Sequence, residues 1–283
     1  MPTYKKTALI TGSTSGIGKA VAFKLASKNY RILLLSRNLD KLIKTKNEIS
    51  AVTNNPDIYT FECDLASQKQ IRSISAEIRN KFPVIDVLVN NAGINTSTFE
   101  VTPDGVEKTF AVNHFAYFLL TGLLLDSIKK SDQGRVINVS SNGHKKVKLD
   151  IEKIRSNQYQ GKYSTYRRSK LANVMFTIDL AERLSNTSVT VNTVHPGLIK
   201  TNIGSDDPGI IRKTVNFLKI FFAQSPEKGA DTIVYLATSA NVENITGRYF
   251  INRKITTPSK DVYNISKRNQ LWDLSKKITN FTY

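Results

Sequence analysis

The sequence predicts an α/β protein built on a doubly wound parallel β-sheet, with helices covering both faces. Short apolar runs recur along the chain, and helical stretches separate them. These runs lack a polar–apolar alternation, which is typical of strands buried on both faces. A glycine-rich turn follows the first run and opens the first helix. No internal repeat or low-complexity linker divides the 283 residues, so we expect one domain spanning residues 1–283.

Each predicted element follows from one such run. The expected strands are Thr7–Thr11, Arg31–Leu35, Ile58–Phe61, Val84–Val89, Arg135–Val139 and Val189–Val194. The expected helices are Gly18–Lys28, Leu39–Ala51, Gln68–Phe82, Pro103–Lys129 and Tyr163–Leu184. Because strands and helices alternate, the helices must cross over the sheet faces, which predicts three α/β/α layers.

The chain is strongly basic, with 41 Lys and Arg against 23 Asp and Glu and a net charge of +18. Such a charge fits nucleic acid or an anionic membrane surface. The basic residues are spread along the chain, however, and no zinc-ligand set, helix-turn-helix pattern or RNA-binding motif accompanies them. We therefore interpret the charge as a generally basic surface and expect neither a nucleic-acid partner nor a bound metal.

Cysteine content and hydropathy indicate an intracellular protein. The single Cys63 excludes a disulfide scaffold and a cysteine-based zinc site, which favours a reducing compartment. The apolar run Ala8–Ile10 is too short for a signal peptide or a membrane helix. No other apolar run is expected to reach the roughly 20 residues that span a bilayer. We expect a cytoplasmic protein or one peripheral to a membrane.

A glycine-rich segment between the first strand and the first helix suggests a phosphate-binding loop. Its residues are Gly12, Ser13, Thr14, Ser15, Gly16, Ile17 and Gly18. Glycines allow a tight turn and a close approach to a pyrophosphate, and the helix N-terminus offers free N–H groups and a positive dipole. The spacing G-x-x-x-G-x-G differs from the usual dinucleotide fingerprint G-x-G-x-x-G. A plain connecting loop is the alternative.

The end of the second strand indicates which dinucleotide would bind. It reads Leu35-Ser36-Arg37-Asn38 and lacks the carboxylate that holds the ribose 2′-OH of NAD. The Arg37 guanidinium instead suits a phosphate. This favours NADP over NAD, with a solvated surface arginine as the alternative.

Candidate acid–base residues follow the fifth strand. Tyr166 and Lys170 are four residues apart and share a helical face, so the ammonium should lower the phenol pKa from about 10. That would make Tyr166 a general acid or base, although Tyr163 and Arg167 have the same spacing. A serine hydroxyl at the end of the fifth strand (140–141) could hold a substrate carbonyl, or merely form a turn.

Together these motifs resemble the short-chain dehydrogenase/reductase family. The matching residues are Thr11-Gly12-x-x-x-Gly16-x-Gly18, Asp64-Leu65, Asn90-Asn91-Ala92-Gly93, Asn113, Ser141, Tyr166-x-x-x-Lys170 and His195-Pro196-Gly197, in the family's order over nearly the whole chain. A closer resemblance is to the NADP-dependent retinol dehydrogenases. It is carried by Val112-Asn113-His114-Phe115, Ser169-Lys170-Leu171-Ala172-Asn173, Phe176, Val194-His195-Pro196-Gly197, Gly247-Arg248-Tyr249-Phe250 and Leu271-Trp272.

The resemblance implies a Rossmann fold and a hydride transfer between NADP(H) and a small carbonyl or alcohol substrate. Tyr166 would donate or accept the proton, Lys170 would lower its pKa and hold the nicotinamide ribose, and Ser141 rather than Ser140 would bind the substrate oxygen. Asn113 would anchor a relaying water. The remaining implied cofactor contacts are Asp64 and Leu65 at adenine, Asn91, Ala92 and Gly93 at the adenine ribose, and Pro196, Gly197, Ile199 and Thr201 at the nicotinamide.

The family usually places a substrate lid after the His-Pro-Gly motif, here at about 200–225. Its apolar composition suits a lipophilic substrate such as a retinoid or steroid. The basic residues Arg212, Lys213 and Lys219 also suit weak contact with a membrane surface. The segment 145–161 would form another wall of the substrate cleft, with a solvated loop as the alternative. The resemblance further implies a homodimer through the helices of Asn113 and Tyr166, and a non-catalytic NADP(H)-sensing protein is the alternative function.

Overall fold

The computed structural model describes residues 5–96, 98–158, 162–197 and 225–283, with only the backbone at 162 and 163. The predicted lid therefore lies outside the described residues, apart from its last position. Ile199 and Thr201 lie outside them too.

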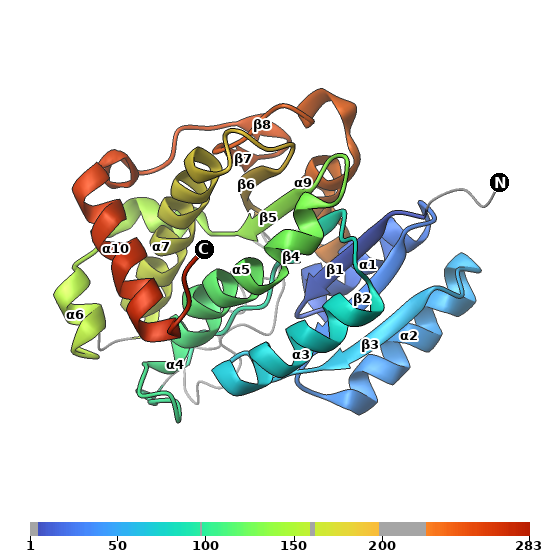
Figure 1. Ribbon diagram of the computed structural model, residues 1–283, viewed down its shortest axis with the longest axis horizontal. Coiled ribbons are helices and arrows are strands. Elements are labelled where there is room, and N and C mark those ends of the chain that lie inside the picture. Colours follow the sequence, from blue (N-terminus) through green and yellow to red (C-terminus); the bar gives the residue numbers. More distant parts are fainter. Residues whose placement is uncertain (1–4, 97, 159–161, 198–224) are drawn as a thin grey trace.

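Eight strands form one sheet in the order β3-β2-β1-β4-β5-β6-β7-β8 (Figure 1). Their bounds are β1 Thr7–Thr11, β2 Arg31–Ser36, β3 Ile58–Glu62, β4 Val87–Asn90, β5 Arg135–Val139, β6 Thr190–His195, β7 Tyr249–Ile251 and β8 Lys254–Ile255. All neighbours pair in parallel except β7 and β8, which are antiparallel. The strand order reverses between β1 and β4, the switch point where doubly wound sheets bind ligands. The predicted fold class is confirmed.

Helices connect the strands and cover both faces of the sheet. They are α1 Gly16–Ala26, α2 Leu39–Thr53, α3 Gln68–Lys81, α4 Lys108–Phe110, α5 Ala116–Lys129, α6 Ile151–Arg155, α7 Lys162–Arg183, α9 Pro226–Thr238 and α10 Ile265–Thr279. A π-helical turn, η1 Ala111–Phe115, joins α4 to α5. Short 3₁₀ turns are η2 Asn142–Lys146, η3 Ala240–Val242 and η4 Lys260–Tyr263.

Neighbouring residues along each strand enter opposite hydrophobic layers, which explains the absence of alternation in the sequence. Leu9, Leu33 and Leu88 pack against α3, α5 and α7. Ile10 and Leu34 pack against α1, α2 and α9 on the other face. Because both faces are buried, each strand position must be apolar or hydrogen-bonded.

The C-terminal helix α10 covers the outer surface of α5 and α7 (Figure 1). Trp272 of α10 packs against Phe118 and Phe176, with ring centroids 5.1 and 6.1 Å away. The Tyr283 hydroxyl donates to the Phe118 carbonyl at 2.6 Å. A third apolar cluster joins α10 to α6, so part of the segment 145–161 packs beneath this helix. The homodimer through the helices of Asn113 and Tyr166 stays a prediction.

Several predicted boundaries were wrong. The expected strand at 84–89 begins only at Val87, and just before it the Asp86 carboxylate accepts from Thr7 N at 2.7 Å and from the Ser131 hydroxyl at 2.7 Å. The expected helix over 103–129 begins at Lys108, since Gly105 adopts φ +75° in a turn. Glu107 then caps it by accepting from the amides of residues 109 and 110.

The stretch Lys108–Lys129 corrects a second expectation. It forms a helix long and apolar enough to cross a membrane, a length that no run was expected to reach. In this fold 83% of its most apolar window is buried. Burial of that extent is what a core helix of a packed domain shows.

Candidate active site

The glycine-rich loop lies at the carboxyl end of β1, pressed against the end of β4. Gly12 and Gly16 adopt φ +64° and +53°, which favour glycine. A Cβ atom at Gly12 would stand 2.9 Å from Ala92 Cα, and one at Gly18 would collide with the Gly12 carbonyl oxygen. The glycines are therefore required by the turn and by close packing against the next strand.

Side chains at the end of β4 fix the position of this loop. Asn91 Nδ2 donates to the Thr11 carbonyl at 2.8 Å. The Thr11 hydroxyl in turn accepts from the amides of Asn91 and Ala92, each at 2.9 Å. The expected adenine-ribose residues 91–93 thus lie directly beside the loop, and Asn91 helps to build it.

The start of α1 is suited to an anion. Ser15 is its N-cap residue, but its side chain makes no capping hydrogen bond. The first N–H groups of this 11-residue helix consequently remain free to bind a pyrophosphate. Ser13 and Thr14 hold the loop to β2, through Leu35 O at 3.4 Å and the Ser36 hydroxyl at 3.2 Å. The loop residues therefore fit a dinucleotide.

Arg37 follows β2 at the same edge of the sheet and is exposed. It forms no ion pair with any residue that the structure describes, so its guanidinium is free to reach a phosphate. Its neighbour Asn38 caps α2 by accepting from Lys41 N at 2.8 Å. The cap on α2 thus fixes the backbone beside Arg37 at the edge of the sheet that carries the glycine loop, while the Arg37 side chain stays exposed.

The two serines after β5 have different partners. The buried Ser140 hydroxyl donates to the Lys170 carbonyl at 2.8 Å, which ties β5 to α7. The Ser141 hydroxyl instead hydrogen-bonds the phenol of Tyr166. Of the two serines, only Ser141 therefore presents its hydroxyl beside the phenol, and its role at the substrate oxygen stays a prediction. The side chain of Tyr163, the alternative tyrosine, lies outside the described residues.

Lys170 is buried at 2% exposure beneath the tyrosine. Its Nζ donates to the Val139 carbonyl at 3.0 Å and lies 5.7 Å from the centre of the Tyr166 ring. Burial lowers the pKa of Lys170 to about 7 and raises the pKa of Tyr166 to about 12, while the Ser141 hydrogen bond opposes the rise. The expected lowering of the tyrosine pKa by the ammonium was wrong for this geometry, because desolvation of the buried ring raises the pKa and the Ser141 hydroxyl is the group that opposes the rise.

Asn113 reaches the same point from the π-helical turn η1. Its Oδ1 accepts from Ile94 N at 2.8 Å, and its Nδ2 donates to Ile94 O at 3.0 Å and to the Ser169 hydroxyl at 3.0 Å. A Cβ at Gly93 would stand 3.3 Å from Lys170 Nζ and 3.4 Å from Asn113 Oδ1. Gly93, Lys170 and Asn113 therefore converge, and π-turns of this kind recur at functional sites.

The other expected cofactor residues lie at the same carboxyl edge of the sheet. Asp64 and Leu65 follow β3, and the Asp64 carboxylate accepts from Ala66 N at 2.9 Å. Pro196 and Gly197 follow β6, with Gly197 at φ +96°. No group of His, Cys, Asp and Glu that could hold a metal occurs among the described residues.

Some residues of the site went unrecognised in the sequence. Tyr117 donates to the Ala92 carbonyl at 2.7 Å, and Lys170 Nζ lies 5.4 Å from the centre of its ring. His144 is fully buried and bonds the Ser141 carbonyl at 2.7 Å. Tyr117 lies one turn after Asn113 and His144 three residues after Ser141, but neither spacing distinguishes a site residue from a core residue.

Comparisons with known proteins identify the family. A family model described as short chain dehydrogenase matches residues 6–208. Retinol dehydrogenase 14 of Mus musculus is 38% identical over 96% of this chain and 85% of its own length. Retinol dehydrogenase 13 of Homo sapiens is 36% identical over 96% and 84%. The short-chain dehydrogenase TIC 32 A, chloroplastic, of Brassica napus is 33% identical over 96% and 88%.

Solved structures share the fold. An uncharacterised protein from Mycobacterium paratuberculosis superposes with a TM-score of 0.78 and 26% identity, covering 98% of this chain and 94% of its own. Levodione reductase gives 0.70 at 22% identity, covering 86% and 94%. The chain therefore belongs to the short-chain dehydrogenase/reductase family, in its retinol dehydrogenase-like group, and is a nicotinamide-dependent oxidoreductase.

Proposed function

We propose that this protein is an NADPH-dependent reductase of carbonyl substrates, with Tyr166 as the proton donor. The observation that carries the proposal is the convergence of four side chains at one end of the sheet. The Tyr166 phenol bonds the Ser141 hydroxyl, and Lys170 Nζ and Asn113 Oδ1 meet around Gly93. This cluster lies beyond the ends of β4 and β5, on the side of the glycine loop.

The proposed mechanism assigns a task to each residue. NADPH, when bound, supplies the hydride for the carbonyl carbon. The Ser141 hydroxyl hydrogen-bonds the carbonyl oxygen and orients it, and Tyr166 donates its proton to that oxygen as negative charge develops. Lys170 and Asn113 lie on the inner side of the tyrosine, where they would hold the nicotinamide ribose and a water that returns the proton.

The protonation state of Tyr166 gives the two directions of the reaction different pH dependences. With a pKa of about 12, the phenol carries the proton that carbonyl reduction requires. Alcohol oxidation needs the phenolate instead, so its rate should rise with pH through the alkaline range. Initial rates in both directions between pH 6 and 10 test this. A pH-independent oxidation rate would contradict Tyr166 as the base.

The proton donor is tested by Tyr166→Phe. This change removes one hydroxyl and should lower kcat by roughly 10²- to 10⁴-fold, the usual contribution of general acid catalysis. NADPH affinity, measured by quenching of protein fluorescence, should stay within about 2-fold. An unchanged kcat would refute the mechanism. Lost affinity together with lost activity would indicate misfolding.

A preference for NADPH over NADH is proposed from Arg37. Its free guanidinium beside the loop suits the 2′-phosphate, and none of the four residues 35–38 is acidic. A relative of the same fold, the actinorhodin polyketide ketoreductase, was solved with NADPH. Arg37→Asp should raise the Kd for NADPH by 10-fold or more and leave NADH binding unchanged or improved. Equal losses for both cofactors would overturn the assignment.

The substrate class is proposed as lipophilic aldehydes and ketones, following the printed names of the retinol dehydrogenase relatives. Oxidation of NADPH with retinal, a steroid ketone, a quinone and a short aldehyde would rank the classes. Turnover of any of them excludes a cofactor-sensing protein without activity. A second proposal is weak contact of residues 212–219 with a membrane surface. These residues lie outside the described ones, and flotation with anionic liposomes would test the contact.

A further inference from the structure

His144 lies next to the proposed site and contacts its serine, although the proposed mechanism does not use it. The side chain is fully buried in η2, three residues after Ser141. Its Nδ1 lies 2.7 Å from the Ser141 carbonyl oxygen. Its Nε2 lies 3.1 Å from the backbone nitrogen of Ser259, 115 residues further along the chain. The imidazole thus bridges the end of β5 and the segment before η4.

These two contacts fix the protonation state of the ring. The Ser141 carbonyl can only accept a hydrogen bond, so Nδ1 must carry the proton. The Ser259 N–H can only donate, so Nε2 must be bare. His144 is therefore neutral and in its Nδ1–H form. Burial lowers its pKa to about 4, with a further lowering from Lys145, which agrees with a ring that stays neutral at physiological pH.

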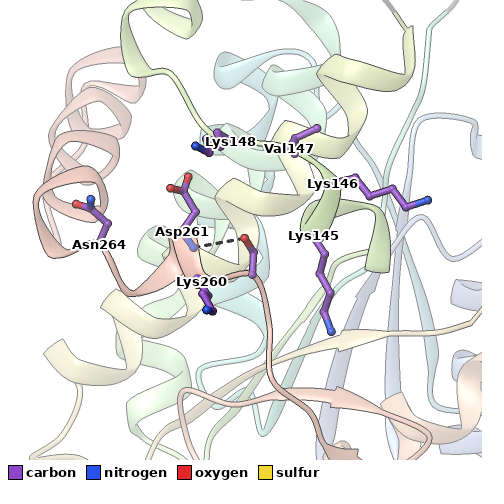
Figure 2. Close-up of a pocket in the computed structure, with 8 residues that line it drawn as sticks. Lys145, Lys146, Val147, Lys148, Lys260, Asp261 and Asn264 are labelled. Carbon is purple, nitrogen blue, oxygen red and sulfur yellow. Dashed lines mark hydrogen bonds between the residues drawn. The ribbon is translucent and has the colours of Figure 1, made fainter.

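The surroundings of the ring leave it little freedom. Tyr249 of β7 packs edge-on against it, with centroids 4.9 Å apart and planes at 84°. The His144 amide also donates to the Ser141 carbonyl, at 3.1 Å. Ser259 and Lys145 line a cavity of about 540 Å³ between η2 and η4 (Figure 2). Figure 2 labels Lys145 of η2 and Asp261 of η4 among the residues that line this cavity.

We propose that His144 is a positioning residue: its imidazole clamps the Ser141 backbone to the Ser259 segment and so aims the Ser141 hydroxyl at Tyr166. The inference rests on the role proposed above for Ser141. Ser141 begins η2, and its hydroxyl accepts from Gly143 N at 3.2 Å while also bonding the tyrosine. A small rotation of Ser141 would break its bond to the Tyr166 phenol. Among the described residues, His144 supplies the side chain that holds the Ser141 carbonyl and so prevents this rotation.

Histidine variants separate the two halves of the clamp. His144→Ala removes both contacts and should lower kcat roughly 10- to 100-fold, the order expected when a reacting group shifts by about 1 Å. His144→Asn places an amide N–H near the former Nδ1 and should restore most of kcat. His144→Gln retains an acceptor near the former Nε2 and should rescue less. These kcat values are measured with retinal or a quinone as substrate. The affinity for NADPH should stay within about 2-fold of wild type in all three variants.

Ser259 offers a matched test from the other side of the bridge. Its φ of −60° is compatible with proline, so Ser259→Pro deletes the N–H donor with little backbone strain. The hydroxyl of Ser259 also caps η4, and Ser259→Ala removes this cap but keeps the N–H. We expect Ser259→Pro to lower kcat and Ser259→Ala to leave it near wild type. Equal effects of the two would assign the loss to the cap and contradict the clamp.

Two readouts distinguish positioning from general stabilisation. The Ser141 bond lowers the Tyr166 pKa, so losing it should raise that pKa further and lower the oxidation rate at a given pH between 6 and 10 more than the reduction rate, alike in His144→Ala and Ser141→Ala. Lys170 and Tyr117, the other titrating groups beside the phenol, are unchanged in both. The second readout needs no activity. With only three histidines, ¹⁵N-histidine NMR should show that the ring lost in His144→Asn is an Nδ1–H ring that does not titrate near pH 6.5. The rings of His114 and His195, whose pKa values burial also lowers to about 4, should remain in that variant.

The outcomes separate this proposal from the proposed function. If Ser141→Ala and Tyr166→Phe are inactive while His144→Ala is fully active, the clamp is refuted and the function stands. If Tyr166→Phe remains active, the mechanism fails. An Nε2–H ring, or titration of His144 near its ordinary pKa, refutes the clamp whatever the activity.

Discussion

The N-terminal part of the molecule, residues 5–96, is held together differently from the C-terminal part, the described residues from 98 to 283. In the N-terminal part the site is built from glycines at the end of β1, which the side chains of Thr11 and Asn91 hold against the end of β4. In the C-terminal part, buried side chains bridge distant segments. His144 meets Ser259 across 115 residues, and His114 Nε2 meets the Ser275 hydroxyl at 3.0 Å across 161.

The contrast shows that the two parts tolerate different kinds of substitution. A glycine loop depends on the absence of side chains, so it fails when atoms are added. The site around Ser141 and Asn113 depends on polar side chains delivered by the C-terminal segment, so it fails when atoms are removed or protonated. Asn173 illustrates this, since it donates to the Asn113 carbonyl at 2.8 Å and bonds His114 at 3.2 Å.

The largest effect is expected from loosening α10. Trp272 packs between α5, α7 and the C-terminus, and Arg183 lies 4.0 Å from the centre of its ring. Trp272→Ala should cost about 3–5 kcal/mol of unfolding free energy. Urea unfolding measures this, with Trp272→Phe as a milder control. A loss below about 1 kcal/mol would mean that α10 is only a peripheral cover.

Acid should weaken the C-terminal part first, because all three histidines lie there. Burial lowers the pKa of His114, His144 and His195 to about 4 each. The unfolded chain therefore binds protons between pH 6.5 and 4 that the folded chain does not, and stability falls as pH drops through this window. Burial raises the pKa of Asp179 to about 6, so the folded chain binds a proton there more tightly than the unfolded chain. Asp179 therefore adds stability as the pH drops from 6 to 3.8.

We expect a net loss of about 3 kcal/mol between pH 7.5 and 5.5. Hydrogen exchange at the two pH values, corrected for intrinsic rates, should show the larger loss of protection in β5–β7, α7 and α10. His114→Asn should make the pH dependence shallower. Uniform loss across both parts would contradict the comparison.

A smaller change of stability is expected from filling the glycine loop. Gly18→Ala places a methyl group against the Gly12 carbonyl and should cost about 1–3 kcal/mol. It should also weaken NADPH binding by 10-fold or more, because the loop must move. Gly105→Asn is the control, since no atom lies within 4 Å of its Cβ position and asparagine tolerates a positive φ. Thermal unfolding and cofactor titration test both variants.

The smallest effects are expected at two matched helix caps. Asn38 begins α2 and Asn264 begins α10, each 15 residues long, and each asparagine accepts from the amide three residues later. Asn38→Ala and Asn264→Ala should each cost about 1 kcal/mol. If the comparison holds, only Asn264→Ala also lowers kcat. Equal kcat values for both would show that α10 does not act on the site.

The order of elements and the motifs were predictable from local pattern. The glycine loop, Arg37 and the pair Tyr166 and Lys170 could be read because each lies at a strand end or on one helix face. The starts of β4 and α4 could not be predicted, because the side-chain hydrogen bonds of Asp86 and Glu107 and the positive φ of Gly105 are not visible in the sequence. The pKa of Tyr166 was also unpredictable, because it depends on how completely the ring is removed from water.

The sequence by itself determined the doubly wound sheet, the family and the candidate site residues, because strand and helix patterns repeat locally and motifs keep a fixed spacing. Only the tertiary structure decided that α10 covers α5 and α7, that a π-turn delivers Asn113, and that His144 bridges Ser141 and Ser259. These contacts join segments more than a hundred residues apart or depend on burial, and no local pattern encodes either.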